Sequence, residues 1–292
     1  MNSKTTSALQ WRKMKNADEE IILADKMLFD MENNYTCACA KFLSRNPSKD
    51  PVWFLSEKKQ KPKALIINSK SAILPVFSGF DNIPSPKFLG NFFHLKKIHS
   101  IQGLREEVLF LEDAVNNFGK EVSGFFDYDL MSLDLKSNEQ ITKSNLSIPG
   151  LILRVPRMTD LDALFPLQAA YEREEVLHKG SFFHPAACKV NLAHIVSGGR
   201  ILAAELNGRL IGKINVSGIS FTKYLIGGVF VHPDFRGQGI ARVMTSHFLS
   251  SLLSQDESMG AALFVKKSNI AAQKLYKRLG FKSKNDFRIT YF

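Results

Sequence analysis

An apolar strand, a short loop with two glycines and an amphipathic helix follow one another in the second half of the chain. The strand-like run is Tyr224–Val231, the loop contains Gly237 and Gly239, and apolar residues then recur at helical spacing from Val243 to Leu252. Glycine lets a ligand approach the backbone closely, and the first turn of a helix carries unpaired N–H groups at the positive end of its dipole. This order predicts an anion site in the loop; a glycine-bearing turn without a ligand is the alternative.

Periodicity predicts further strands and helices around this motif. Asn207-Gly208 is typical of a two-residue hairpin turn, because both positions favour positive φ. Tyr224–Val231 is apolar along its whole length, which favours a central place in a sheet. The other expected elements are helices that begin at Thr159 or Asp160, at Ala186 and at Asn269 (the last closed by Gly280), and strands over Leu151–Val155, Arg200–Leu206, Arg209–Val216, Ala261–Val265 and Phe287–Phe292.

The first half has a different order of elements. A helix is expected from Asn16, which can cap it, through the apolar positions up to Met31. Val52–Leu55 and Ala64–Ile67 flank a polar turn and predict a hairpin, and Ala72–Phe77 predicts a further strand. Helix, hairpin and strand in this order indicate an α+β domain, and this half contains no glycine-rich phosphate loop.

A polar, linker-like stretch, Ser132–Pro149, separates the two halves. The length of 292 residues also favours two domains, which we expect at residues 1–148 and 149–292. The net charge of +11 is unevenly divided, since 20 basic and 18 acidic residues precede residue 149, whereas 19 basic and 10 acidic residues follow. A basic second half suits a phosphate-bearing ligand, nucleic acid, an acidic protein or a membrane surface, or is simply a solvated face.

Several classes of protein are not expected. The longest apolar run has eight residues, whereas a membrane-spanning helix needs ~20. The first residues lack the continuous apolar segment of a secretory signal, and three cysteines form no closed disulfide set, so we expect a cytoplasmic protein with no membrane partner. The histidines and the Cys37-Ala38-Cys39 pair lack metal-ligand spacing, so no metal site is expected.

Two motifs resemble the GNAT superfamily of N-acetyltransferases. The first matches the signature R/Q-x-x-G-x-G/A, and the second resembles N-x-x-A-x-x-x-Y-x-x-x-G-F. They are Arg236-Gly237-Gln238-Gly239-Ile240-Ala241, which follows a run similar to the family's fourth strand, and Asn269 through Phe281. The resemblance covers about residues 150–292 and implies a central mixed sheet flanked by helices. It is closest to a group in which a divergent GNAT-like half precedes the active one; an unrelated α+β domain is the alternative for the first half.

The resemblance implies acetyl-CoA as co-substrate. Main-chain groups of Val229, Phe230 and Val231 would pair with its pantetheine arm, and the amides of Gly237, Gln238, Gly239, Ile240 and Ala241 would bind its pyrophosphate. Arg236 would shape the loop and add charge, Asn269 would hold the pantetheine, and Ala271 and Ala272 would leave room for it.

The family's general acid corresponds to Tyr276, which would protonate the departing CoA thiolate; a packed core aromatic is the alternative. The general base is not evident, because Gly227 and Gly228 stand where many family members place a glutamate. Glu174 and Glu175 are candidates for binding the acceptor or acting as base, unless they form a solvated helix end.

The sequence therefore predicts an acetyl-CoA-dependent N-acetyltransferase that transfers the acyl group directly to the amine of a small molecule or peptide. A non-catalytic acyl-CoA-binding sensor is the main alternative. Nucleic acid is a less favoured partner, because basic and aromatic residues do not interleave as on a stacking surface. The acceptor, the preferred acyl chain and the oligomeric state are not indicated by the sequence.

Overall fold

The structure is a computed structural model that describes residues 9–15, 17–56, 61–81, 83–90, 98–134, 147–178 and 180–292, with Leu253 described by its backbone alone. The chain divides into two compact units. Unit 1 comprises Met1–Asp129 together with Lys284–Phe292, and unit 2 comprises Leu130–Ser283. Among the described residues, no helix combines the length and the apolar character that a membrane crossing requires.

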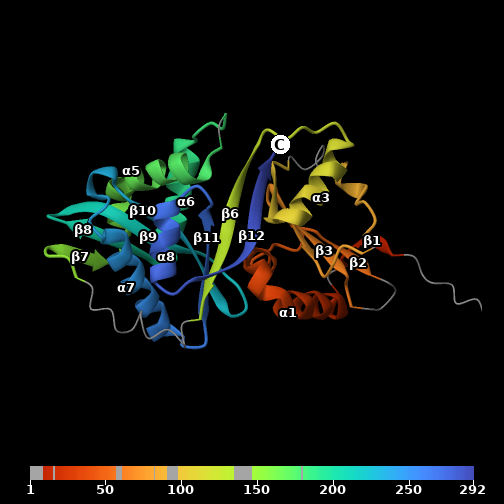
Figure 1. Cartoon of the computed structure of the whole chain (residues 1–292), viewed down its shortest axis with the longest axis horizontal. Helices are drawn as coiled ribbons and strands as arrows, with labels where there is room; N and C mark the ends of the chain where they lie inside the picture. The colour runs from red at the N-terminus through yellow and green to blue at the C-terminus, as the bar shows by residue number, and fades with distance from the viewer. Residues whose placement is uncertain are drawn as a thin grey trace, which may run out of the picture. The chain divides into compact units, whose positions relative to one another are not determined.

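The described part of unit 1 contains a mixed sheet and the helices α1 and α3 (Figure 1). Its strands lie in the order β1-β2-β3-β4-β5-β12, antiparallel except for β4 and β5, which are parallel. Its elements are β1 (Gln10–Lys13), α1 (Asp18–Leu43), β2 (Val52–Ser56), β3 (Ala64–Ser69), β4 (Ala72–Phe77), β5 (Ser100–Leu104) and α3 (Arg105–Asn116); β6 (Gly124–Leu133) and β12 (Lys282–Tyr291) continue into unit 2.

The elements expected in the first half are present, with longer bounds for the helix. Helix α1 continues past Met31 to Leu43, with a kink at Tyr35 where φ is −124°. Strands β2 and β3 form the expected antiparallel hairpin. Asn16, the expected cap, and Lys58–Gln60 of the hairpin turn lie outside the described residues.

The last strand of the chain belongs to unit 1. Strand β12 pairs with β5, from Phe287 opposite Leu104 to Tyr291 opposite Ser100. The sequence predicted a strand over Phe287–Phe292 within a second domain of residues 149–292. In the structure, residues 284–292 belong to unit 1. The hydrogen bonds between β12 and β5, and not the position of β12 along the chain, therefore determine the unit to which this strand belongs.

Unit 2 is also a mixed sheet covered by helices. Its strands lie in the order β6-β11-β10-β9-β8-β7, with β10 central as expected and parallel to β11. Its elements are β7 (Leu151–Arg154), α5 (Leu161–Tyr171), a π-helical turn (Glu172–Val176), α6 (Pro185–Ser197), β8 (Ile201–Leu206), β9 (Arg209–Ile219), β10 (Lys223–Val231), α7 (Ile240–Gln255), β11 (Gly260–Lys266) and α8 (Ile270–Arg278).

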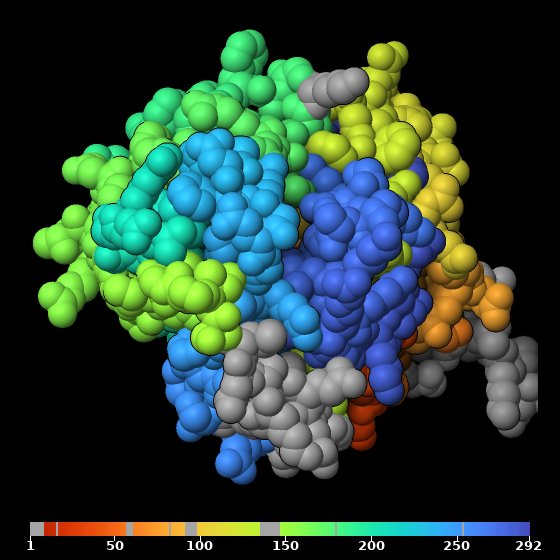
Figure 2. Space-filling model, turned by 60° about the vertical axis from the view of Figure 1, so that its left-hand side comes forward, coloured from red at the N-terminus to blue at the C-terminus, as the bar shows by residue number. Residues whose placement is uncertain are grey.

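Helices cover both faces of the unit 2 sheet, because successive side chains of a strand point to opposite faces. Ile201 and Ala203 of β8 pack in a cluster with α5 and α6, whereas Leu202 and Ala204 pack in a second cluster with α7 and α8. Helices α7 and α8 lie side by side on one surface of this unit (Figure 2). The expectation of a mixed sheet flanked by helices is confirmed.

Local signals in unit 2 behave as the sequence predicts, with one exception. Asn207 and Gly208 have φ of 50° and 76° in the β8–β9 turn, and Gly280, with φ of 90°, follows the end of α8. Asp160 precedes α5, but its carboxylate accepts from the Arg154 guanidinium at 2.8 and 2.9 Å and does not cap the helix.

The linker-like stretch begins later than expected. Ser132 and Leu133 are still part of β6, and residues 135–146 lie outside the described residues.

Candidate functional site

Strands β10 and β11 separate part-way along their length. They pair in parallel over four residues each, from Lys223 opposite Gly260 to Ile226 opposite Leu263. No further rung joins the two strands within the described chain, although β10 runs on to Val231. The main-chain groups of β10 beyond Ile226 are therefore left without a partner on β11.

A β-bulge lies on the other edge of β10, where its pairing with β9 shifts register between Gly227 and Phe230. Gly228 adopts φ of +61° within the bulge. A Cβ on Gly228 would lie 2.0 Å from Oδ1 of Asn215 and 2.7 Å from Nζ of Lys213. Backbone conformation and close approach both require glycine at this position. The strand thus lacks a carboxylate here because two polar side chains of β9 fill the place.

The loop between β10 and α7 presents main-chain donors to solvent. Gly237 and Gly239 have φ of 79° and 80°, and nothing lies within 4 Å of a Cβ on either residue. The five amides from Gly237 to Ala241 have no hydrogen-bond partner among the described residues, and they stand at the N-terminus of the 16-residue helix α7. An open loop with free amides at the positive end of a helix is suited to a phosphate group.

Arg236 is held at the start of this loop by two acceptors. Its Nε donates to the carbonyl of Val231 at 2.9 Å, and its Nη2 donates to Oε2 of Glu174 at 2.9 Å. The guanidinium also lies 5.1 Å from the ring centroid of Phe230. The side chain therefore links the loop to its own strand and to the turn after α5, and it already donates to the carbonyl of Val231.

The side chain of Asn269 has both of its polar atoms engaged. Oδ1 accepts from the Ala272 amide at 3.1 Å, which caps α8, and Nδ2 donates to Oε1 of Glu175 at 3.3 Å. Ala271 is exposed and Ala272 is half-buried. Nδ2 carries a second N–H that is not used in the bond to Glu175, and the expected pantetheine contact of Asn269 stays a prediction.

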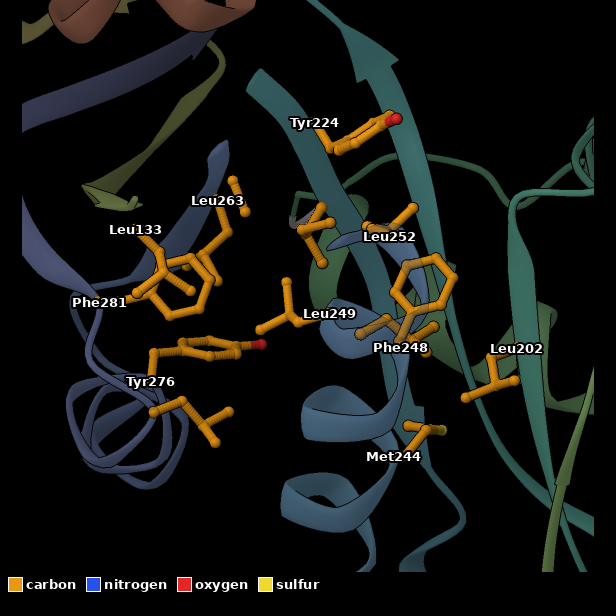
Figure 3. Packing of buried hydrophobic residues seen from close by; sticks show 14 of the residues in the cluster. Leu133, Leu202, Tyr224, Met244, Phe248, Leu249, Leu252, Leu263, Tyr276 and Phe281 are labelled. Atoms are coloured by element: carbon orange, nitrogen blue, oxygen red, sulfur yellow. The ribbon is translucent and has the colours of Figure 1, made fainter. Parts of the chain in front are cut away.

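Tyr276 is 6% exposed and packs in the apolar cluster of unit 2. Its ring centroid lies 5.8 Å from that of Phe281, and its hydroxyl points toward Leu249 of α7 (Figure 3). No hydrogen-bond partner of the hydroxyl is found in the described part of the chain. Burial, followed by the negative potential of Tyr171 and Glu175, raises the pKa of Tyr276, so the phenol stays protonated at neutral pH. The residue is thus a core aromatic with a neutral hydroxyl, and its role as general acid stays a prediction.

Glu174 and Glu175 lie in the π-helical turn after α5, and both contact the residues expected to bind the coenzyme. The carboxylate of Glu174 accepts a hydrogen bond from Arg236, and its main-chain carbonyl accepts one from Nζ of Lys266 at 2.9 Å. Glu175 lies 3.6 Å from Lys266 and accepts from Asn269. The turn joins the loop before α7 to the end of β11 and the start of α8. A role of either carboxylate in binding the acceptor stays a prediction.

A group of polar side chains beside the bulge was not found from the sequence. The Gly228 amide donates to the hydroxyl of Tyr171, and Nζ of Lys213 donates to the Gly228 carbonyl at 3.0 Å. Nζ also lies 4.7 Å from the centroid of the Tyr171 ring. The Lys213 side chain is 0% exposed, and burial lowers its pKa to about 7 against the attraction of Glu172. A lysine at the middle of an apolar strand was the available signal.

The thiol of Cys188 lies in the same group. It donates to the carboxylate of Glu172, and burial together with that carboxylate raises its pKa to about 12. A thiol that stays protonated is a poor nucleophile.

Within the described residues, no three His, Cys, Asp or Glu side chains are grouped so as to hold a metal ion.

Residues 161–281, which contain the separated strands, the open loop and Tyr276, match the family model described as acetyltransferase (GNAT) family. This segment is a GNAT domain. An acetyltransferase of Pectobacterium atrosepticum is 32% identical to the chain over 84 residues, which are 28% of this chain and 57% of that protein. The chain thus spans a little over half the length of this relative.

Solved structures resemble the whole chain and not only the GNAT domain. A GCN5-related N-acetyltransferase from Sphaerobacter thermophilus has a TM-score of 0.66 at 15% identity, over 97% of this chain and 95% of its own. A tandem GNAT protein from the clavulanic acid biosynthesis pathway has a TM-score of 0.64 at 12% identity, over 97% and 98%. At these identities the likeness concerns the fold, and it extends over both units.

Proposed function

We propose that the GNAT domain transfers an acetyl group from acetyl-CoA directly to the amino group of a small molecule or a peptide. The observation that carries the proposal is the set of five amides at Gly237–Ala241 that have no partner among the residues the structure describes, beside strands that have separated. Membership in the family supports acyl transfer in general. The donor and the chemical class of the acceptor are our inference.

Each part of the site has a task in this proposal. The loop amides and the charge of Arg236 bind the diphosphate of the coenzyme. The main chain of β10 from Val229 to Val231, where the Val231 carbonyl also accepts from Arg236, pairs with the pantetheine arm. Acetyl-CoA supplies an activated thioester. Tyr276, neutral at physiological pH, donates a proton to the sulfur as the thiolate leaves.

Direct transfer is favoured over an acyl-enzyme. Cys188 is buried, and its raised pKa keeps the thiol protonated. Cys37 and Cys39 are buried in α1 of unit 1. None of these three thiols presents an exposed thiolate that could carry the acyl group.

A non-catalytic acyl-CoA sensor is the second candidate. It is favoured by the bulge, where Gly228 replaces a carboxylate, and by the engagement of Glu174 with Arg236 and of Glu175 with Asn269. A sensor would bind the coenzyme without accelerating its reaction with amines.

One experiment separates the two candidates. Calorimetry with CoA and acetyl-CoA measures binding, and release of free thiol is then followed with spermidine, L-lysine, kanamycin and a peptide with a free amino terminus. Binding together with thiol release above the protein-free rate supports the transferase. Binding without release from any amine supports the sensor, and absence of binding at millimolar coenzyme contradicts both.

We also propose that unit 1 is a diverged GNAT-like half that has no coenzyme site. Its parallel strands β4 and β5 separate after two pairs, as β10 and β11 do after four. In unit 1, however, the main chain beyond the separation is occupied, because Phe77 donates to Glu107 at 2.9 Å and accepts from Tyr35 at 3.0 Å. The likeness to a tandem GNAT protein supports this interpretation.

A further inference from the structure

The amine of Lys213 stands where a side chain of residue 228 would stand. A Cβ on Gly228 would lie 2.7 Å from Nζ of Lys213, and Nζ reaches across from β9 to the Gly228 carbonyl. Gly228 lies two residues beyond the point at which β10 leaves β11. The functional group of Lys213 is therefore placed at the β-bulge on the β9 side of β10, two residues past the point where β10 and β11 separate.

The groups nearest to Nζ of Lys213 are uncharged. Its acceptors are the Gly228 carbonyl at 3.0 Å and Oδ1 of Asn215 at 3.4 Å, and the ring of Tyr171 covers it. Within the described chain, no carboxylate lies within 4 Å of Nζ. A lysine held by neutral acceptors and shielded from water loses its proton readily.

Two titratable groups face Lys213 from the neighbouring helical segments. The carboxylate of Glu172, in the π-helical turn, attracts the ammonium form, and so does the Cys188 side chain from α6. Glu172 also accepts from Gln168 at 2.9 Å and from the Cys188 thiol. The carboxylate of Glu172 thus takes these hydrogen bonds from donors other than Lys213.

We propose, on the basis of the function proposed above, that Lys213 is the general base that takes the ammonium proton of the acceptor. It replaces the carboxylate that β10 lacks. Because Lys213 is 0% exposed, the proton reaches its amine through one water molecule in this scheme.

The protons balance in this scheme. The acceptor R–NH₃⁺ gives one proton to the amine of Lys213 and becomes R–NH₂, whose lone pair forms the C–N bond at the thioester carbonyl. The C–S bond breaks, and the thiolate takes the hydroxyl proton of Tyr276. The second nitrogen proton restores Tyr276, and the Lys213 ammonium releases its proton to solvent.

The test compares three variants in thiol release with the amine panel named above. Lys213→Met removes the amine, Lys213→Gln keeps a donor for the Gly228 carbonyl but takes no proton, and Lys189→Gln alters an exposed lysine of α6 that pairs with Asp162. We expect kcat of the wild type to rise up to about pH 7 and then level off. Both Lys213 variants should lose about 100-fold or more in kcat together with this pH dependence. Lys189→Gln should match the wild type.

Binding and titration keep the two proposals distinguishable. Calorimetry should give each Lys213 variant a CoA dissociation constant within about threefold of the wild type, which also shows that the variant folds. If the wild type is active and Lys213→Gln keeps the rate and the pH profile, Lys213 only positions the bulge and this inference is wrong. If the wild type releases no thiol with any amine, the proposed function fails and the inference fails with it.

A measurement on the wild type needs no variant to fold. The ¹³Cε signal of Lys213, assigned by its loss in Lys213→Met or Lys213→Gln, should titrate near pH 7. A titration above pH 9 overturns the inference even in an active enzyme, because the amine would then be protonated throughout the working range.

Discussion

Nη2 of Arg236 donates to Oε2 of Glu174 at 2.9 Å and joins the loop before α7 to the turn after α5. The two side chains are 47% and 42% exposed, so the pair contributes no more than about 1 kcal/mol to stability. Its significance is electrostatic. The carboxylate of Glu174 partly neutralises Arg236, the arginine of the loop motif, at the place where we propose that a diphosphate binds.

Glu174→Gln should therefore strengthen CoA binding, because it removes a negative charge that opposes the ligand. We expect a dissociation constant about threefold lower by calorimetry at low salt, a gain that shrinks as ionic strength rises. Glu257→Gln, which removes an equal charge beyond the far end of α7, serves as the control. Equal effects of the two substitutions would mean that only net charge matters.

Gly239→Ala should weaken CoA binding about tenfold or more, because Gly239 has φ of +80° and its amide belongs to the proposed phosphate site. Gly199→Ala is a matched control. Gly199 has φ of +69°, and nothing lies within 4 Å of a Cβ there either, but it lies in the turn before β8. Both variants should lose about 1–2 kcal/mol of stability, and only the first should lose affinity. A Gly239→Ala variant with unchanged affinity would contradict the phosphate site.

Tyr276→Phe should lower kcat by about 100-fold while the protein binds CoA as before, since only the proton donor is removed. The hydroxyl lacks a partner in the described chain, so the melting temperature should change little. Tyr224→Phe, in the same apolar cluster but before the separation of β10 and β11, should keep full activity. Thiol release measured at saturating acetyl-CoA checks both, and an active Tyr276→Phe would leave the residue a packing role only.

Glu107 makes the stability of unit 1 depend on pH. Burial raises the pKa of Glu107 to about 8, so the folded chain holds a proton that the unfolded chain, with an ordinary carboxyl, loses above about pH 4.5. The contribution of Glu107 to the free energy of unfolding is greatest below about pH 4.5, and it is lost as the pH rises to about 8. We expect the melting temperature to be a few degrees lower at pH 9 than at pH 6.

Glu107→Gln should reduce this loss, because glutamine keeps an oxygen acceptor for the Phe77 amide and the Tyr35 hydroxyl without ionising. Glu106→Gln, at the exposed neighbouring position, should leave the pH dependence as it is. Thermal unfolding followed from pH 5 to pH 9 measures all three proteins. Parallel curves for wild type and Glu107→Gln would assign the dependence to other groups.

The features that the sequence by itself determined are local. Glycines at 237 and 239 allow positive φ before a helix, Asn207-Gly208 closes a two-residue hairpin, and Gly280 ends α8. Each of these depends on a backbone preference within a few residues, which a sequence window contains. The conformation of the glycine loop and the strands that precede and follow it along the chain could therefore be predicted.

The tertiary structure alone decided which distant groups meet. Lys213 reaches Gly228 from 15 residues away, Arg236 meets Glu174 across 62, and β12 joins β5 of the other half of the chain. Such contacts follow from strand register and from burial, which sum many weak long-range interactions that no local pattern records. A lysine with ordinary charge in the sequence becomes a candidate base only because the fold removes water from it.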